Sequence, residues 1–107
     1  MIAKEYLREI RKIDTQIKNK AVELKQLKEL DLPSGDLVSS INCLHLKKRG
    51  IIETIEQLPE AEYDVLHKVY VQNETLYEVA SERGISYSLA TTIHGRALKR
   101  LESIINK

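Results

Sequence analysis

The stretch that decides the fold is TLYEVASERGISYSLATTIHGRALKRL, which runs from Thr75 to Leu101. Thr75 stands three residues before Glu78, the spacing of a capping box, in which each side chain bonds the backbone N–H of the other residue. Gly84 can adopt the positive φ that ends a helix, and Ser86 can cap the start of the next one. The stretch therefore predicts two capped helices joined by a tight glycine turn.

Both of these helices have an apolar side that predicts packing against a core. The second helix has an apolar face with helical spacing, made by Ala90, Ile93, Ala97 and Leu101. The first has a shorter stripe, made by Leu76, Val79 and Ala80. We expect the small Ala80 to let the helices cross closely and Ile85 to fill the space between them. This arrangement predicts a helix-turn-helix, whose second helix enters the major groove of DNA.

The other side of the second helix carries a set that we call the reading face: Ser88, Thr91, Thr92, Gly95 and Lys99. Short hydroxyl side chains and glycine are poor helix formers, so their presence predicts the close approach of another surface, such as a groove edge. Serine and threonine hydroxyls can bond many base edges and a threonine methyl can touch thymine, which discriminates bases less well than a bidentate arginine.

We also predict a set of residues that contact the DNA backbone: Thr75, Gly95, Arg96, Lys99 and Arg100. The three basic residues continue the reading face and its flanks, and Thr75 stands at a helix N-terminus, where phosphate binds well. The alternative interpretations are a solvated helix end that favours positive charge, and a threonine that only caps its helix. We expect His94 to pack at the edge of the core.

The first half of the chain predicts a helical arm. Residues 2–30 contain neither Gly nor Pro and repeat an a/d pattern every seven residues, made by Ala3, Tyr6, Ile10, Ile13, Ile17, Lys20, Leu24 and Leu27. Residues 31–36 break the helix, and residues 37–58 repeat the same spacing. The short connection favours an antiparallel hairpin, although self-association of residues 1–57 into a homodimer is an alternative use of the seam. Lys20 and Lys48 interrupt the seams and either meet acids across the hairpin or mark where its helices diverge.

Another helix is predicted before the two of the helix-turn-helix. It begins at Leu58-Pro59-Glu60, and its buried residues are expected to be Tyr63, Leu66, Val69 and Tyr70. The fold class is therefore all-α, with a helical arm or coiled-coil-like hairpin over residues 1–57. A three-helix unit with the helix-turn-helix follows over residues 58–107.

A family resemblance now becomes specific, because it follows several motifs in order over about residues 52–104. They are Leu58-Pro59, the helix through Leu66 to Tyr70, the segment 75–80, Gly84-Ile85-Ser86 and the segment 93–101. These motifs resemble sigma-factor region four, and most closely the small phage-encoded sigma-like activators of the ArpU and RinA type. The resemblance implies base contacts from Tyr87, Ser88, Thr91 and Thr92, and contact with RNA polymerase. Sigma factors carry Arg, Glu and Gln at several of these positions, so a sigma-like consensus site is not implied.

Composition excludes several other classes of protein. The net charge of +1 argues against a strongly basic, non-specific nucleic-acid binder. The start of the chain is too charged for a signal peptide, no apolar run reaches the length of a membrane span, and the lone Cys43 fits a reducing cytoplasm. No nucleophile and base set, phosphate loop or metal-ligand spacing is present, so we predict neither an enzyme nor a cofactor nor a metal site.

The sequence thus predicts a cytoplasmic, phage or prophage transcription regulator that binds double-stranded DNA. One alternative is an adaptor that grips RNA polymerase or another regulator without reading bases, using an acidic face at Glu60, Glu62 and Asp64. Another is the DNA-recognition subunit of a phage packaging machine.

Overall fold

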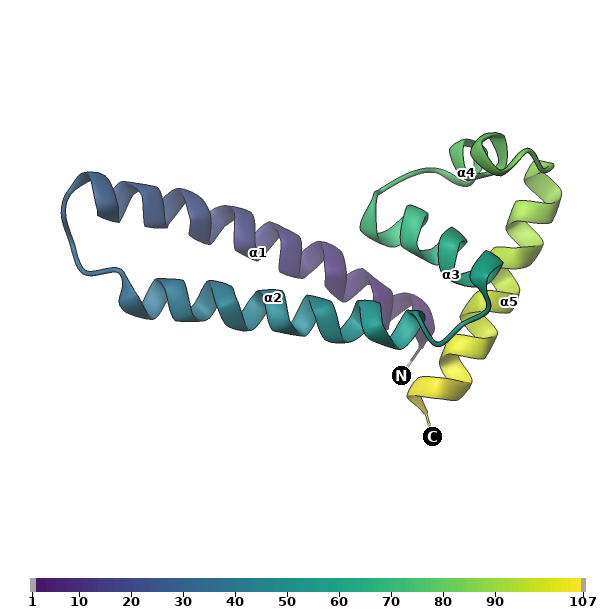
Figure 1. Cartoon of the computed structure of the whole chain (residues 1–107), viewed down its shortest axis with the longest axis horizontal. Helices are drawn as coiled ribbons and strands as arrows, with labels where there is room; N and C mark the ends of the chain where they lie inside the picture. Colours follow the sequence, from purple (N-terminus) through teal and green to yellow (C-terminus); the bar gives the residue numbers. More distant parts are fainter. Residues whose placement is uncertain (1, 107) are drawn as a thin grey trace.

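The computed structural model describes residues 2–106, and over that range the chain is helical and has no strand. Its elements are α1 (Ala3–Glu29), α2 (Gly35–Ile55), α3 (Glu60–Leu66), the π-helical turn η1 (His67–Val71), α4 (Leu76–Arg83) and α5 (Tyr87–Ile105). Helices α1 and α2 form an antiparallel hairpin that projects from the unit made by α3, α4 and α5 (Figure 1). The predicted all-α fold with an N-terminal hairpin is confirmed.

The second helix of the hairpin is continuous through Gly50. A Cβ at Gly50 would meet nothing within 4 Å, so this glycine lies on an open side of the helix and disturbs no packing. Helix α2 ends at Ile55 rather than at residue 58, and Leu58 is buried in the turn that follows. Ser34 is the residue at the N-cap, but its side chain makes no capping hydrogen bond.

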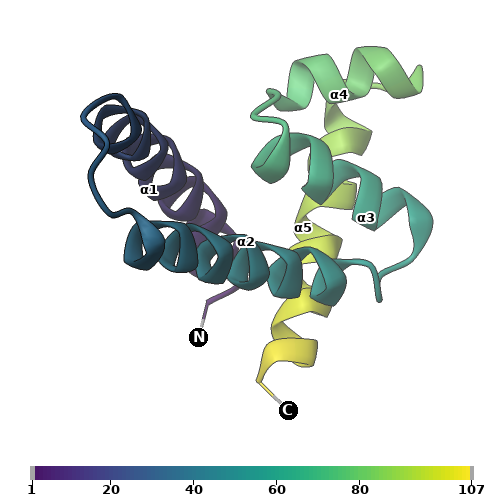
Figure 2. The same ribbon diagram turned by 60° about the vertical axis from the view of Figure 1, so that its left-hand side comes forward.

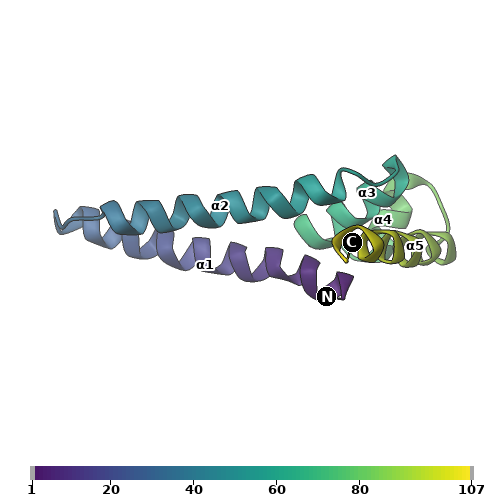
Figure 3. The same ribbon diagram turned by 90° about the horizontal axis from the view of Figure 1, so that it is seen from below.

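Burial along the hairpin decreases towards its tip. The seam residues Ala3, Ile10 and Ile13 are buried, whereas Ile17 and Leu24 are only half-buried. Lys48 Nζ lies 2.7 Å from Asp14 Oδ1, so this interrupting lysine meets an acid across the hairpin. Figure 3 shows the two helices extending together away from the rest of the molecule, with both termini near the opposite end.

The base of the hairpin shares one core with the C-terminal helices. A single cluster of buried residues joins Leu7 and Ile10 of α1 to Leu66 of α3 and Leu101 of α5. Leu7 is fully buried although it stands outside the predicted seam, because α1 packs against α5 and η1 as well as α2. The predicted boundary at residues 57 and 58 therefore does not interrupt the core.

The C-terminal helices form a small bundle around α5. Figure 2 shows α5 passing behind α3, with α4 lying across the N-terminal end of α5. Helix α3 begins at Glu60, one residue after its N-cap Pro59. Leu66 and Tyr70 are buried as predicted, whereas Tyr63 and Val69 are only partly buried. The fully buried Val65 was not predicted.

Candidate nucleic-acid interface

The turn between α4 and α5 has the geometry that its residues predict. The hydroxyl of Thr75 accepts a hydrogen bond from the Glu78 backbone at 3.2 Å, and the Glu78 carboxylate accepts one from the Thr75 backbone at 3.3 Å. Gly84 has φ 66°, and the N–H of Ile85 donates to the carbonyl of Ala80 at 3.0 Å. These bonds form a capping box at the start of α4 and a Schellman motif at its end.

The start of α5 is fixed in the same way. Ser86 has an extended backbone, and its hydroxyl accepts a hydrogen bond from the Leu89 N–H at 3.1 Å. Ala80 and Ala90 are both buried, so small side chains are present where α4 and α5 pack together. Ile85 and Ile93 are only half-buried, which makes their predicted burial incomplete. The N-terminal part of α5 is therefore positioned by its cap and by small buried residues, whereas Ala97 and Leu101 anchor its C-terminal part in the shared core.

The reading face lies on the outside of the molecule. Ser88, Thr91, Thr92, Gly95 and Lys99 are all exposed. The buried residues of α5 are Ala90, Ala97 and Leu101, which lie on the opposite side of the helix. The N-terminal half of α5 also lies beside α4 and away from the hairpin (Figure 1). This face is thus open to solvent at the end of α5 that lies away from the hairpin.

Both threonines of the reading face hydrogen-bond within their own helix. The hydroxyl of Thr91 donates to the carbonyl of Tyr87, and that of Thr92 donates to the carbonyl of Ser88, each at 3.0 Å. Helical threonines commonly bond the carbonyl four residues earlier. As a consequence, these two hydroxyls present lone pairs outward while their protons are engaged.

An exposed aromatic pair joins α4 to the start of α5. The rings of Tyr77 and Tyr87 stack with centroids 4.1 Å apart and planes at 12°, and the two residues are 68% and 44% exposed. Their positions near the starts of α4 and α5 gave no sequence signal for this contact, because it depends on how the two helices cross. Tyr77 therefore lies beside the predicted base-contacting residue Tyr87.

The basic residues of α5 have different surroundings. Arg96 and Lys99 are exposed, as expected for residues that contact a phosphate backbone. The guanidinium of Arg100 instead donates to the carboxylate of Glu62 at 3.1 Å, and Glu62 is only 6% exposed. Arg100 therefore balances a buried negative charge in α3, although its own side chain is 57% exposed.

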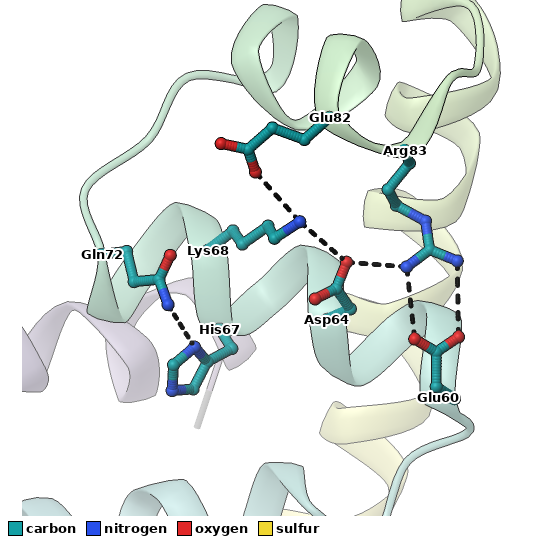
Figure 4. Close-up of polar contacts among 7 residues, drawn as sticks. All are labelled: Glu60, Asp64, His67, Lys68, Gln72, Glu82 and Arg83. Carbon is teal, nitrogen blue, oxygen red and sulfur yellow. Dashed lines mark hydrogen bonds and ion pairs between the residues drawn. The ribbon is translucent and has the colours of Figure 1, made fainter.

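Ion pairs connect α3 and η1 to α4. Arg83 lies 2.7 Å from Asp64 and 3.3 Å from Glu60, and Lys68 lies 3.4 Å from Asp64 and 2.9 Å from Glu82 (Figure 4). Burial alone would raise the pKa of Asp64, but the hydrogen bonds and charges of Arg83 and Lys68 outweigh it and hold that pKa below its usual value. The hydrogen bond from Lys68 to Glu82 in turn raises the pKa of Lys68.

This network changes the interpretation of the acidic residues at the start of α3. Glu60 and Asp64 are both paired with Arg83, and Glu62 is buried against Arg100. Of the expected acidic face, Glu60 is exposed, Asp64 is partly buried and paired with Arg83, and Glu62 is buried and does not contribute to the surface. The three carboxylates orient α3, α4 and α5 relative to one another.

His94 packs at the edge of the core, as predicted. Its ring stacks on Tyr70 with centroids 5.8 Å apart, and its Nε2 lies 3.0 Å from the Tyr70 hydroxyl. Burial lowers the pKa of His94, and the positive charge of Lys4 lowers it further. The histidine therefore belongs to the contact between α5 and η1 rather than to the reading face.

Two other features, a metal-ligand cluster and a membrane span, are absent from residues 2–106. No group of three or more His, Cys, Asp or Glu side chains in this range is placed to hold a metal ion. None of the described helices combines the length and the apolar character that crossing a bilayer requires. Cys43 is exposed on α2.

One comparison with known proteins found a similarity over the C-terminal helices. Residues 54–102, a little under half of the chain, match the family model described as sigma-70, region 4. Searches of curated proteins and of solved structures found no match to the chain. The matched segment begins in the last turn of α2 and includes α3, η1, α4 and nearly all of α5. The similarity covers the whole predicted helix-turn-helix, and it points to DNA binding by this part of the chain.

Proposed function

We propose that the protein is a sequence-specific regulator of transcription that binds duplex DNA through α5. The observation that carries this proposal is the exposed reading face on a helix of the region 4 type. In a helix-turn-helix the second helix enters the major groove and contacts base edges, mainly with its N-terminal residues. Tyr87, Ser88, Thr91 and Thr92 occupy this part of α5 and are its proposed base contacts.

Contacts to the DNA backbone come from exposed groups around this helix. Arg96 follows Thr92 by about one helical turn and Lys99 by about two, and both are exposed, so they are the proposed contacts to the strands beside the groove. Thr75, the N-cap of α4, and Gly95, whose backbone is uncovered on α5, are the other proposed backbone contacts. Arg100 contributes less to binding than Arg96 and Lys99, because it already neutralises Glu62.

The proposed site of action is a promoter, together with RNA polymerase, in a phage or prophage. The support for this is the similarity of residues 54–102 to sigma-70 region 4 and the resemblance of the motifs to phage-encoded activators. The burial of Glu62 and the pairing of Asp64 with Arg83 weaken the alternative of an adaptor that uses an acidic face.

Charge-matched variants test the proposal. Arg96→Ala together with Lys99→Ala removes two proposed phosphate contacts, and Lys25→Ala together with Lys28→Ala removes the same charge near the hairpin tip. Fluorescence anisotropy on a duplex selected from genomic fragments is then recorded over a range of salt concentrations. We expect the α5 variant to weaken binding to every duplex and to reduce the salt slope by about 2, at roughly 0.9 per phosphate contact. Equal binding by the two variants, or no duplex selected by the wild type, would refute the proposal.

The role in transcription needs a separate measurement. Run-off transcription with purified RNA polymerase, on a template that carries the selected site, is expected to change when the protein is added. The α5 variant is expected to lose this effect and the hairpin variant to keep it. A change in transcription that both variants produce equally would favour the adaptor instead.

A further inference from the structure

The two threonines of the reading face offer DNA a methyl group rather than a hydroxyl proton. Each hydroxyl proton is engaged with a carbonyl of the preceding helical turn, at 3.0 Å from Tyr87 for Thr91 and from Ser88 for Thr92. Both side chains are exposed, and the methyl is the other heavy-atom group on each Cβ. The outward chemistry of these residues is therefore one apolar methyl group and the lone pairs of one oxygen.

The residues around them favour close contact with a groove. Ser88, Thr92 and Gly95 lie on one side of α5 because they are three and four residues apart. A Cβ at Gly95 would meet nothing within 4 Å, so the backbone is uncovered there and the helix can sit deep in a groove. Lys99 continues the same side one turn further on, at a distance that suits a phosphate. Short side chains can thus reach the base edges.

Thymine matches the methyl half of this chemistry, whereas the outward lone pairs match the amino groups of adenine and cytosine. In the major groove only thymine presents a methyl group, whereas guanine presents two acceptors and is best read by a bidentate donor. Neither Thr91 nor Thr92 provides two donors, and their hydroxyl protons are already used. We propose that Thr91 and Thr92 read the C5-methyl groups of thymine, so that the target site contains T·A pairs opposite the start of α5. This inference rests on the proposed DNA binding.

The expected effect follows from the burial of methyl groups. Removing one methyl from such a contact weakens binding by roughly fourfold, and removing two weakens it by about 15-fold. Replacing thymine with deoxyuridine removes only the C5-methyl and keeps every hydrogen-bonding group of the base pair. This substitution therefore isolates the proposed contact.

The first experiment selects duplexes from a random pool and then compares each selected site with its deoxyuridine copy. We expect the wild type to lose about fourfold to 15-fold in affinity on the copy. Equal affinity for the two duplexes would overturn the inference while leaving DNA binding intact. If no sequence is enriched, the proposed function itself fails, and thymine reading fails with it.

Two matched variants separate the methyl from the hydroxyl. Thr91→Val with Thr92→Val keeps both methyls and the branched Cβ, and we expect it to bind as tightly as the wild type and to keep the preference for thymine over deoxyuridine. Thr91→Ser with Thr92→Ser keeps the bonded hydroxyls and loses the methyls, so it should lose that preference. If the serine variant keeps the preference for thymine over deoxyuridine, the threonine methyls do not read the C5-methyl and the inference fails. Circular dichroism checks that both variants keep their helices.

Discussion

Substitutions at Gly95 are expected to change the stability of α5 and its proposed contact with DNA in different ways. This glycine lies in the interior of a 19-residue helix, on the exposed side, and a Cβ added to it would meet nothing within 4 Å. Alanine in place of glycine in a helix interior is favoured by about 0.8–1.0 kcal/mol. We therefore expect Gly95→Ala to raise the unfolding free energy by about that amount, and the melting temperature by roughly 4–8 °C for a domain of this size.

A longer side chain at the same position tests the interface. Gly95→Gln also improves helix propensity, so the fold should again be stabilised. In the complex, however, the glutamine would stand between the helix backbone and the groove. Losing one or two base or phosphate contacts, each worth about 1–3 kcal/mol, weakens binding to the selected duplex by roughly tenfold or more.

Thermal unfolding followed by circular dichroism and anisotropy titration of the same samples measure both effects. The reasoning requires that stability and affinity move in opposite directions in Gly95→Gln. A variant that is more stable and binds DNA as tightly as the wild type would show that this face of α5 does not meet the groove. A less stable variant would show that the open space at Gly95 was misjudged.

Three other changes give distinct results. Arg100→Ala leaves the buried carboxylate of Glu62 unpaired. Breaking a fully buried pair costs about 3–5 kcal/mol, but the Arg100 side chain is exposed, so we expect a loss of roughly 1–2 kcal/mol in the free energy of unfolding. Urea unfolding measures this loss, and an unchanged midpoint would contradict it. Tyr77→Ala removes the ring stacked on Tyr87, so we expect weaker DNA binding, whereas Tyr77→Phe keeps the ring and should bind normally; equal losses would mean that the hydroxyl matters instead. Burial holds the pKa of His94 below its ordinary value of 6.5, so the folded state binds fewer protons than the unfolded state below about pH 6.5. Stability should therefore fall as the pH decreases through that range, less so in His94→Gln, and identical pH profiles would exclude this source.

Local signals explain why the helix-turn-helix could be predicted from the sequence. The capping box of Thr75 and Glu78, the positive φ of Gly84 and the cap at Ser86 each depend on residues within a few positions of one another. Contacts of this kind can be predicted from residue type and from the spacing between residues. The structure therefore has the helix boundaries of this region where the sequence places them.

Contacts between distant segments could not be predicted in this way. Glu62 and Arg100 are 38 residues apart, and Leu7 is buried by helices that come much later in the chain. The stacking of Tyr77 on Tyr87 depends on the angle at which α4 crosses α5. The π-helical turn η1 likewise has no marker in residue type. These features follow from packing, which periodicity alone does not specify.

Self-association through the hairpin is a prediction that the structure does not test. Its seam is buried at Ile10 and Ile13 but only half-buried at Ile17 and Leu24, towards the tip. Pairing within the chain therefore uses the base of the seam most fully. Self-association through residues 1–57 stays a prediction, which sedimentation at increasing protein concentration can measure.

The most direct measurement is the affinity of the wild-type protein for a selected duplex and for a scrambled duplex of the same composition, at one physiological salt concentration. Specific readers of DNA bind their sites about 10³-fold or more tightly than other sequences. If the exposed face of α5 reads bases, the protein should bind the selected duplex at least about 10³-fold more tightly than the scrambled duplex. Thr91→Ala with Thr92→Ala should reduce this ratio of affinities. Equal affinity for the two duplexes would contradict base reading by α5.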